Sequence, residues 1–147
     1  MFKKLVPLFI SLGLLFSVAY GGENYTLSGE VGFQDDGDIY ICLFALEKYA
    51  EFQRPGHDLS QPECKHIRMN DDLKKAGKVS FKFESIPKGT YCIVGYQDEN
   101  NNGKVDFENY SINEPWETYK EKPIVGVTWD QIKFDLEENI SGIKIQI

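Results

Sequence analysis

Residues 79–97 read VSFKFESIPKGTYCIVGYQ, and this stretch decides the fold class. Over residues 79–84 apolar and polar side chains alternate with the period of two that a strand shows when one of its faces lies in a core. The Pro87-Lys88-Gly89 sequence then predicts a turn, and residues 90–97 have the composition of a second strand. We therefore expect an antiparallel hairpin at this point of the chain.

The same alternation recurs toward both ends of the sequence. It is present at residues 25–33, 132–136 and 143–147, and we expect the last two segments to pair through the turn at residues 137–142. Residues 39–46 are apolar on both faces, which is typical of a central strand covered on each side. About seven short strands without a strong amphipathic helix predict an all-β fold, an antiparallel Greek-key β-sandwich of immunoglobulin or transthyretin type.

Residues 47–78 interrupt this pattern. They are polar and irregular, with short helices possible at residues 46–52 and 71–76. We interpret the segment as an insertion in the sandwich, with an exposed tip. The tip carries His57 and His66, which we expect to be solvated loop residues.

Residues 1–21 are typical of a secretory signal peptide. Lys3 and Lys4 precede an apolar run at residues 5–18 that is short for a membrane span, and small side chains suited to cleavage follow. Cleavage would leave a single exported domain at residues 22–147, placed in the periplasm or outside the cell and without further membrane contact. An uncleaved N-terminal anchor is the alternative.

The exported part is strongly acidic. The 16 basic residues of the chain, less Lys3 and Lys4, leave 14 against 23 acidic residues, a net charge of −9. Nucleic acid is a poor partner for such a surface, because phosphate binding needs a basic face. Acidity fits a cation-binding protein, although it also occurs in proteins that bind no cation.

Three cysteines, Cys42, Cys64 and Cys92, fall within the exported part. In an oxidising compartment this odd number predicts one disulfide and one remaining thiol. Cys42 and Cys92 lie in strand-like apolar runs, where they could be bridged to each other or serve as small buried hydrophobes. The sequence leaves the pairing open.

Residues 98–106 read DENNNGKVD, and this oxygen-rich loop is the main functional clue. A calcium loop of the EF-hand type takes oxygen ligands from alternate positions and has glycine at the sixth, where the backbone turns sharply. Here Gly103 takes the sixth position. The expected ligands are Asp98, Asn100, Asn102, the main-chain carbonyl of Lys104, and Asp106.

The match weakens at the twelfth position, which normally carries a bidentate glutamate. This chain has Asn109 there, and Glu108 is the nearest carboxylate. We therefore expect weak binding of calcium, roughly 10⁻⁴ to 10⁻³ M, unless Glu108 completes the site. The alternative is an Asn- and Gly-rich turn without a metal, since these residues also bond their own main chain.

The sequence carries no motif of a hydrolase, a metalloprotease or a phosphate-binding loop, so we do not expect an enzyme. Asp98 and Asp106 are better explained as ligands of one cation than as an acid and base pair. The aromatic residues near the loop suggest another use, an exposed platform for a sugar or a peptide that needs no metal. They are Tyr110, Trp116, Tyr119 and Trp129.

Residues 86–106, IPKGTYCIVGYQDENNNGKVD, resemble a signature of an uncharacterised bacterial family of exported domains. The resemblance continues through Glu114 and residues 129–134. It implies a small β-sandwich with a Gly-Thr-Tyr strand followed by an Asp/Asn/Gly loop, and no settled activity. Two features depart from it: Gln97 stands where a histidine is expected, and residues 116–119 replace a Gly-Phe-Ser stretch.

Together these observations predict an exported, non-catalytic β-sandwich module with a structural calcium loop. A glycan or protein at the cell surface is the expected kind of partner. The alternative is a metal-independent carbohydrate- or peptide-binding module that uses the aromatic residues near the loop.

Overall fold

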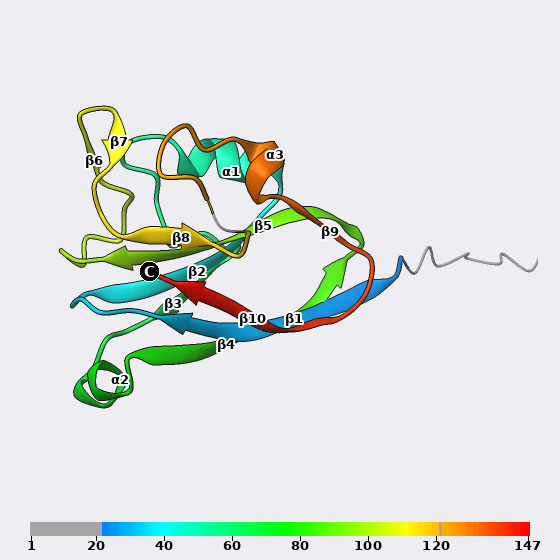
Figure 1. Cartoon of the computed structure of the whole chain (residues 1–147), viewed down its shortest axis with the longest axis horizontal. Coiled ribbons are helices and arrows are strands. Elements are labelled where there is room, and N and C mark those ends of the chain that lie inside the picture. Colours follow the sequence, from blue (N-terminus) through cyan, green and yellow to red (C-terminus); the bar gives the residue numbers. More distant parts are fainter. Residues whose placement is uncertain (1–21, 121) are drawn as a thin grey trace, which may run out of the picture.

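The computed structural model describes residues 22–120 and 122–147, so the expected signal peptide lies outside the described residues. The chain is mostly β-strand, in several sheets, with a few short helices (Figure 1). None of the helices in the described ranges combines the length and hydropathy that a membrane crossing requires. The expectation of an all-β class is confirmed.

The elements follow one another from β1 near the N-terminal end of the described chain to β10 at its C-terminal end. The strands are β1 (Asn24–Gly32), β2 (Asp38–Phe44), β3 (Cys64–Ile67), β4 (Lys78–Pro87), β5 (Gly89–Asp98), β6 (Phe107–Glu108), β7 (Ser111–Ile112), β8 (Trp116–Thr118), β9 (Phe134–Leu136) and β10 (Ile140–Gln146). The helices are α1 (Leu46–Phe52), α2 (Asp71–Ala76) and α3 (Trp129–Ile132).

Two sheets form the body of the molecule. One has the order β10-β1-β4, and the other has the order β3-β2-β5-β8, with β9 also pairing with β5. Strands β6 and β7 form a separate two-stranded hairpin. Strand β10 runs parallel to β1, so the expectation of a wholly antiparallel arrangement is wrong for this pair.

The expected hairpin between residues 79–84 and 90–97 is also wrong. Strand β4 pairs with β1, while β5 pairs with β2, so the chain crosses from one sheet to the other between them. Phe83 of β4 and Ile93 of β5 belong to the same apolar cluster. Alternation reports which face of a strand is buried, but it does not identify the strand that is its hydrogen-bonded neighbour.

The two final strands do not pair with each other either. Strand β9 pairs with β5, and β10 pairs with β1. The turn between them therefore carries the chain across the core to the opposite sheet, which explains why both segments alternate in polarity although they are not neighbours.

A first apolar cluster draws its buried side chains from the strands of both sheets. It contains Leu27, Val31, Phe33, Ile39, Ile41, Leu43, Phe81, Phe83, Ile93, Phe134, Leu136, Ile143 and Ile145. Members that alternate along each strand face the same side, which is the arrangement of two sheets packed face to face.

Strand β2 is buried on its second face as well. Tyr40, Cys42 and Phe44 belong to a second apolar cluster, which also contains Phe52 of α1 and Ile132 of α3. Figure 1 shows these two helices on the side of the β5–β8 strands that lies away from β1 and β4. The expectation that something packs over the second face of residues 39–46 is therefore confirmed.

The segment at residues 47–78 contributes a strand to the larger sheet. Strand β3 pairs with β2, and this register places Cys64 directly opposite Cys42, where the two form a disulfide. Cys92 is the free thiol and is buried, which raises its pKa to about 12. One bridge with one thiol left over is confirmed, whereas a Cys42–Cys92 bridge is wrong.

The interpretation of both histidines as solvated loop residues is wrong in a different way for each: His57 lies in a loop but is partly buried, whereas His66 is exposed but lies in strand β3. In β3, the ring of His66 stacks on Tyr40 with centroids 4.5 Å apart, and its Nε2 lies 2.7 Å from the Asp38 carboxylate. His57 packs edge-on against Phe44 and Phe52, and burial lowers the pKa of its imidazole. The segment is thus part of the core structure.

Candidate ion-binding loop and its surroundings

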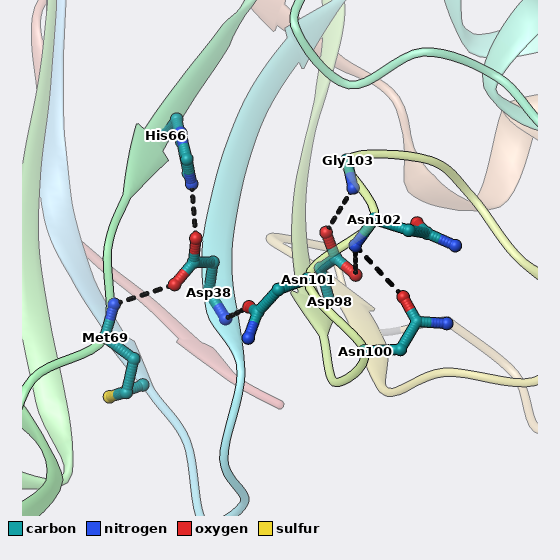
Figure 2. A network of polar contacts seen from close by, with 8 residues as sticks. All are labelled: Asp38, His66, Met69, Asp98, Asn100, Asn101, Asn102 and Gly103. Carbon is teal, nitrogen blue, oxygen red and sulfur yellow. Dashed lines mark hydrogen bonds and ion pairs between the residues drawn. The ribbon is translucent and has the colours of Figure 1, made fainter.

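The loop at residues 98–106 begins at the last residue of β5. Asp98 is fully buried, and its two carboxylate oxygens accept main-chain hydrogen bonds from Asn102 at 3.1 Å and Gly103 at 2.7 Å (Figure 2). Gly103 has a φ of 71°, which is the left-handed conformation that glycine adopts without strain. The aspartate therefore folds the chain back over itself within five residues.

The start of the loop is fastened to the neighbouring strand. Asn101 accepts a hydrogen bond from the Asp38 N–H at 2.8 Å, at the beginning of β2 (Figure 2). Gly37 lies against Asp98 at the end of β5, and a Cβ at position 37 would be 2.4 Å from the Asp98 carbonyl oxygen. Glycine at position 37 thus permits the close approach of the loop to β2.

The side chains at the alternate positions gather together. Asn100 Oδ1 accepts a hydrogen bond from the Asn102 N–H at 3.1 Å, and Asn102 Oδ1 accepts one from the Lys104 N–H at 2.9 Å. Both side-chain amides donate to the same Asp106 oxygen, at 2.6 and 2.8 Å. The structure thus brings together the side chains of Asp98, Asn100, Asn102 and Asp106.

The hydroxyl of Tyr96 is hydrogen-bonded to the main chain of the loop. Its hydroxyl accepts a hydrogen bond from the Asp106 N–H at 3.1 Å and lies 3.3 Å from the Lys104 carbonyl oxygen. It also donates to the carboxylate of Glu114. Burial, and then the hydrogen bond to Glu114, raise the pKa of the phenol, so Tyr96 stays protonated as a donor.

Glu114 is a member of the site that sequence reasoning did not include. Its side chain is buried, and one oxygen accepts main-chain hydrogen bonds from Glu99 at 2.9 Å and Asn100 at 3.4 Å. Burial raises its pKa, and the charges of Asp98 and Asp106 raise it further, against the hydrogen bonds from Tyr96 and Asn100. The residue lies beyond the twelve positions of the loop template, so spacing alone offered no signal for it.

The three carboxylates of Asp98, Asp106 and Glu114 form no ion pair with any other described residue within 4.0 Å. Within residues 22–120 and 122–147, no group of three or more His, Cys, Asp and Glu side chains is arranged to hold a metal. The donors gathered here are mixed, with carboxylates, two amides and a main-chain carbonyl. Such a set of oxygens suits a hard cation such as calcium.

Glu108 and Asn109 do not join this group. Glu108 pairs with Ser111 in the β6–β7 hairpin, and Asn109 lies in its turn with a φ of 48°. Both side chains are exposed, and no described hydrogen bond connects them to the loop. The hairpin directs the chain away from the loop before the twelfth position is reached.

Gln97, at the position where a histidine was expected, is fully buried. Its Nε2 donates to the Asp35 carbonyl oxygen at 2.5 Å, while its Oε1 is buried without a hydrogen-bond partner. The residue fastens the chain entering β2 to the end of β5. These contacts indicate that Gln97 has a structural role next to the loop.

The four aromatic residues considered as a platform do not form one exposed surface, although Tyr110 and Trp116 line the same pocket. The ring of Trp116 has Lys122 Nζ 4.8 Å from its centroid and packs edge-on with Phe52. Trp129 packs on Tyr49, and Tyr119 packs on Phe134. Only the fourth residue, Tyr110, is fully exposed.

Comparison with known proteins identifies a family. The model of the family described as "Uncharacterized protein conserved in bacteria (DUF2141)" matches residues 32–140, which is more than half of the chain. No curated protein and no solved structure matches the chain. The chain therefore belongs to this uncharacterised bacterial family, as its resemblance predicted.

Proposed function

We propose that this protein is an exported, non-catalytic β-sandwich module in which residues 98–106 and Glu114 bind a structural calcium ion. The observation that carries the proposal is the gathering of the Asp98, Asn100, Asn102 and Asp106 side chains in one loop, where neither carboxylate forms an ion pair with another described residue. Like charges at such proximity repel one another, and a divalent cation would remove that cost.

Each candidate ligand in the loop contributes one kind of oxygen donor. Asp98 and Asp106 supply charge, Asn100 and Asn102 supply amide oxygens, and Lys104 supplies its carbonyl. In the structure, each of the two amides donates an N–H to the Asp106 carboxylate. A bound cation would replace these N–H groups as the partner of Asp106. A half-turn of each amide exchanges its nitrogen and oxygen at little steric cost, but it gives up the hydrogen bond that the oxygen accepts from the Asn102 or Lys104 N–H, and calcium binding must offset that loss.

Glu114 takes the part that the loop template assigns to the twelfth position. It contributes a carboxylate from outside the loop, in place of the exposed Glu108 or Asn109. Since calcium affinity rises with the number of charged ligands, binding should be tighter than the roughly 10⁻⁴ to 10⁻³ M expected from the loop alone.

Titration calorimetry with calcium tests this assignment. Glu114→Gln should weaken binding on the order of tenfold, because the change removes one charged ligand and keeps the shape of the side chain. Glu108→Gln is the matched control and should leave the dissociation constant unchanged. A wild-type protein that shows no heat of binding at millimolar calcium would refute the proposal, and a loss in Glu108→Gln alone would refute the part given to Glu114.

Export of the mature domain is supported by the Cys42–Cys64 disulfide, since such bonds persist in oxidising compartments. We expect the protein in the periplasm or at the cell surface, with a mature N-terminus close to residue 22. N-terminal sequencing of the protein recovered from cell fractions checks this. Recovery in the cytoplasm with residues 1–21 attached would contradict it.

A further inference from the structure

A pocket of about 650 Å³ lies beside the loop, between the β6–β7 hairpin, the start of β8 and residues 122–127. Figure 1 shows the hairpin and the segment before α3 on the same side of the larger sheet. Apolar side chains form much of the wall: Phe107, Ile112, Trp116 and Val127. The volume is within the range of sites that hold a small molecule or a few residues of a peptide.

The rim of this pocket is unusually apolar. Tyr110, Ile124 and Val125 line it and are 104%, 99% and 84% exposed. They are three of the four exposed large hydrophobic residues of the described chain, and the fourth, Leu46, does not line the pocket. Exposed apolar side chains gathered at one place mark a surface that another molecule covers.

The polar groups of the pocket define what fits it. Gln53 lines it, and its Nε2 is buried without a hydrogen-bond partner. A ligand that accepts a hydrogen bond from Nε2 would remove the free-energy cost of this unsatisfied buried donor. Lys122 lies over Trp116 and pairs with Glu117 at 3.7 Å, so its charge is already compensated. The buried carboxylate of Glu114 also lines the pocket, so its wall is mixed: apolar side chains, one unpaired donor and one carboxylate, with no free cation among the described residues.

Both ends of the hairpin that forms one wall belong to the proposed ion site. Asp106 immediately precedes β6, and Glu114 follows β7 by two residues. The Asn113 N–H donates to the Asp106 carbonyl oxygen at 3.1 Å, which closes the base of the hairpin. An ion held by Asp106 and Glu114 would fix both ends and, with them, the wall of the pocket.

We propose that this pocket binds an apolar segment of a partner polypeptide through one side chain and a main-chain carbonyl, and that the adjoining ion controls its affinity. A polypeptide continues beyond the pocket and covers the exposed rim, which a small molecule held inside would leave in water. Glu108 is exposed on β6 beside the pocket, and the domain at residues 22–147 has a net charge of −9, so the segment carries basic flanks. The control by the ion rests on the proposed function, whereas the pocket itself does not.

The probe is the capped peptide acetyl-Lys-Leu-Phe-Val-Lys-amide, with its Glu-flanked counterpart as the charge control. We expect amide shifts confined to Gln53 and residues 107–127 in a titration followed by nuclear magnetic resonance, and weaker binding of the Glu-flanked peptide. No shifts at millimolar Lys-flanked peptide with calcium present, equal binding of both peptides, or shifts elsewhere in the molecule would overturn the proposal.

Variants separate the pocket from the ion. Ile124→Ser with Val125→Ser should weaken peptide binding at least tenfold and leave the calcium dissociation constant unchanged, whereas Leu46→Ser, the matched control, should change neither. Gln53→Met, which keeps the shape and removes the donor, should weaken the peptide about fivefold. Equal peptide binding by the rim variant and the wild type would overturn the assignment of the pocket.

Calcium and chelator distinguish the two proposals. Peptide affinity should fall about tenfold in chelator for the wild type and change little in Asp106→Asn, which should lose most of the calcium binding at a residue that does not line the pocket. Peptide binding that is unaffected by calcium in a protein that does bind calcium overturns the coupling alone. Peptide binding by a protein that binds no calcium overturns the proposed ion site and leaves the pocket standing.

Discussion

The two faces of the larger sheet are held by different means. The face toward β1, β4 and β10 packs against a second sheet through side chains that alternate regularly along each strand. The opposite face is covered by α1, α3 and connecting segments, and is tied by a disulfide, by Asp38 and by the loop at residues 98–106. The first face depends on periodic apolar packing, and the second on individual contacts.

The first face holds the two sheets together, whereas the second face carries the candidate functional sites. Packed sheets relax little when a side chain is removed, whereas short helices and loops can move into the space that is left. The candidate ion site and the pocket both lie on the face with the individual contacts. We therefore expect that face to respond to ions, redox state and pH, while the sandwich beneath it stays constant.

The largest contrast should come from one substitution made on each face. Ile41 and Ile132 are both fully buried, Ile41 between the sheets and Ile132 in α3. Ile41→Ala should lower the free energy of unfolding by about 4 kcal/mol and Ile132→Ala by about 2 kcal/mol, because the four-residue helix can partly fill the cavity. Urea unfolding measures both. Equal losses, or a larger loss for Ile132→Ala, would contradict the distinction between the faces.

Reduction of the disulfide should have a comparable effect on the second face. The bridge joins Cys42 to Cys64 across 22 residues, so its loss should cost about 3 kcal/mol. Chemical unfolding with and without reductant measures the difference. Cys92→Ala is the control and should lose as much on reduction as the wild type does, since Cys92 is not bridged. A Cys92→Ala protein that is insensitive to reductant would contradict the pairing.

The smallest effect should come from Asp38, which fastens β3 and the chain after it to β2. Burial opposes its ionisation, but hydrogen bonds from the Met69 N–H and His66 hold its pKa below the ordinary value of 3.8. Asp38→Asn should therefore cost about 1 kcal/mol at neutral pH.

The pH dependence of this loss follows from the direction of the pKa shift. An acid whose pKa is lowered by folding stabilises the protein above its unfolded pKa, and that contribution disappears as the pH falls through the folded value. The difference between wild type and Asp38→Asn should thus begin to shrink as the pH falls below about 3.8 and vanish only below the lowered pKa of the folded protein. Glu138→Gln is the exposed control, with no ion pair to another described residue, and should match the wild type at every pH. A difference that persists in acid would contradict this account.

The extent to which the sequence predicted the structure follows the same division. Alternation identified the strands that line the first cluster and the two-sided burial of β2, because both depend on local periodicity. It did not reveal that β4 and β5 lie in different sheets, or that β10 runs parallel to β1. Those are long-range pairings, and polarity along a strand carries no information about them.

The candidate site was predictable only in its local part. The spacing of Asp98, Asn100, Asn102 and Gly103 predicted a tightly turned loop with gathered side chains, which is a property of adjacent residues. Glu114 reaches the same place through the β6–β7 hairpin, so its part depends on the length and direction of that hairpin. The Cys42–Cys64 pairing likewise depended on the register of β3 against β2.

Thermal unfolding with calcium and with chelator tests the central claim most directly. At a hundredfold excess of calcium over its dissociation constant, binding to the folded protein should add about 2.7 kcal/mol and raise the melting temperature by roughly 5–10 °C. Asp106→Asn should lose most of this increase. Equal melting temperatures of the wild type in millimolar calcium and in chelator would contradict the claim that this loop binds a structural ion.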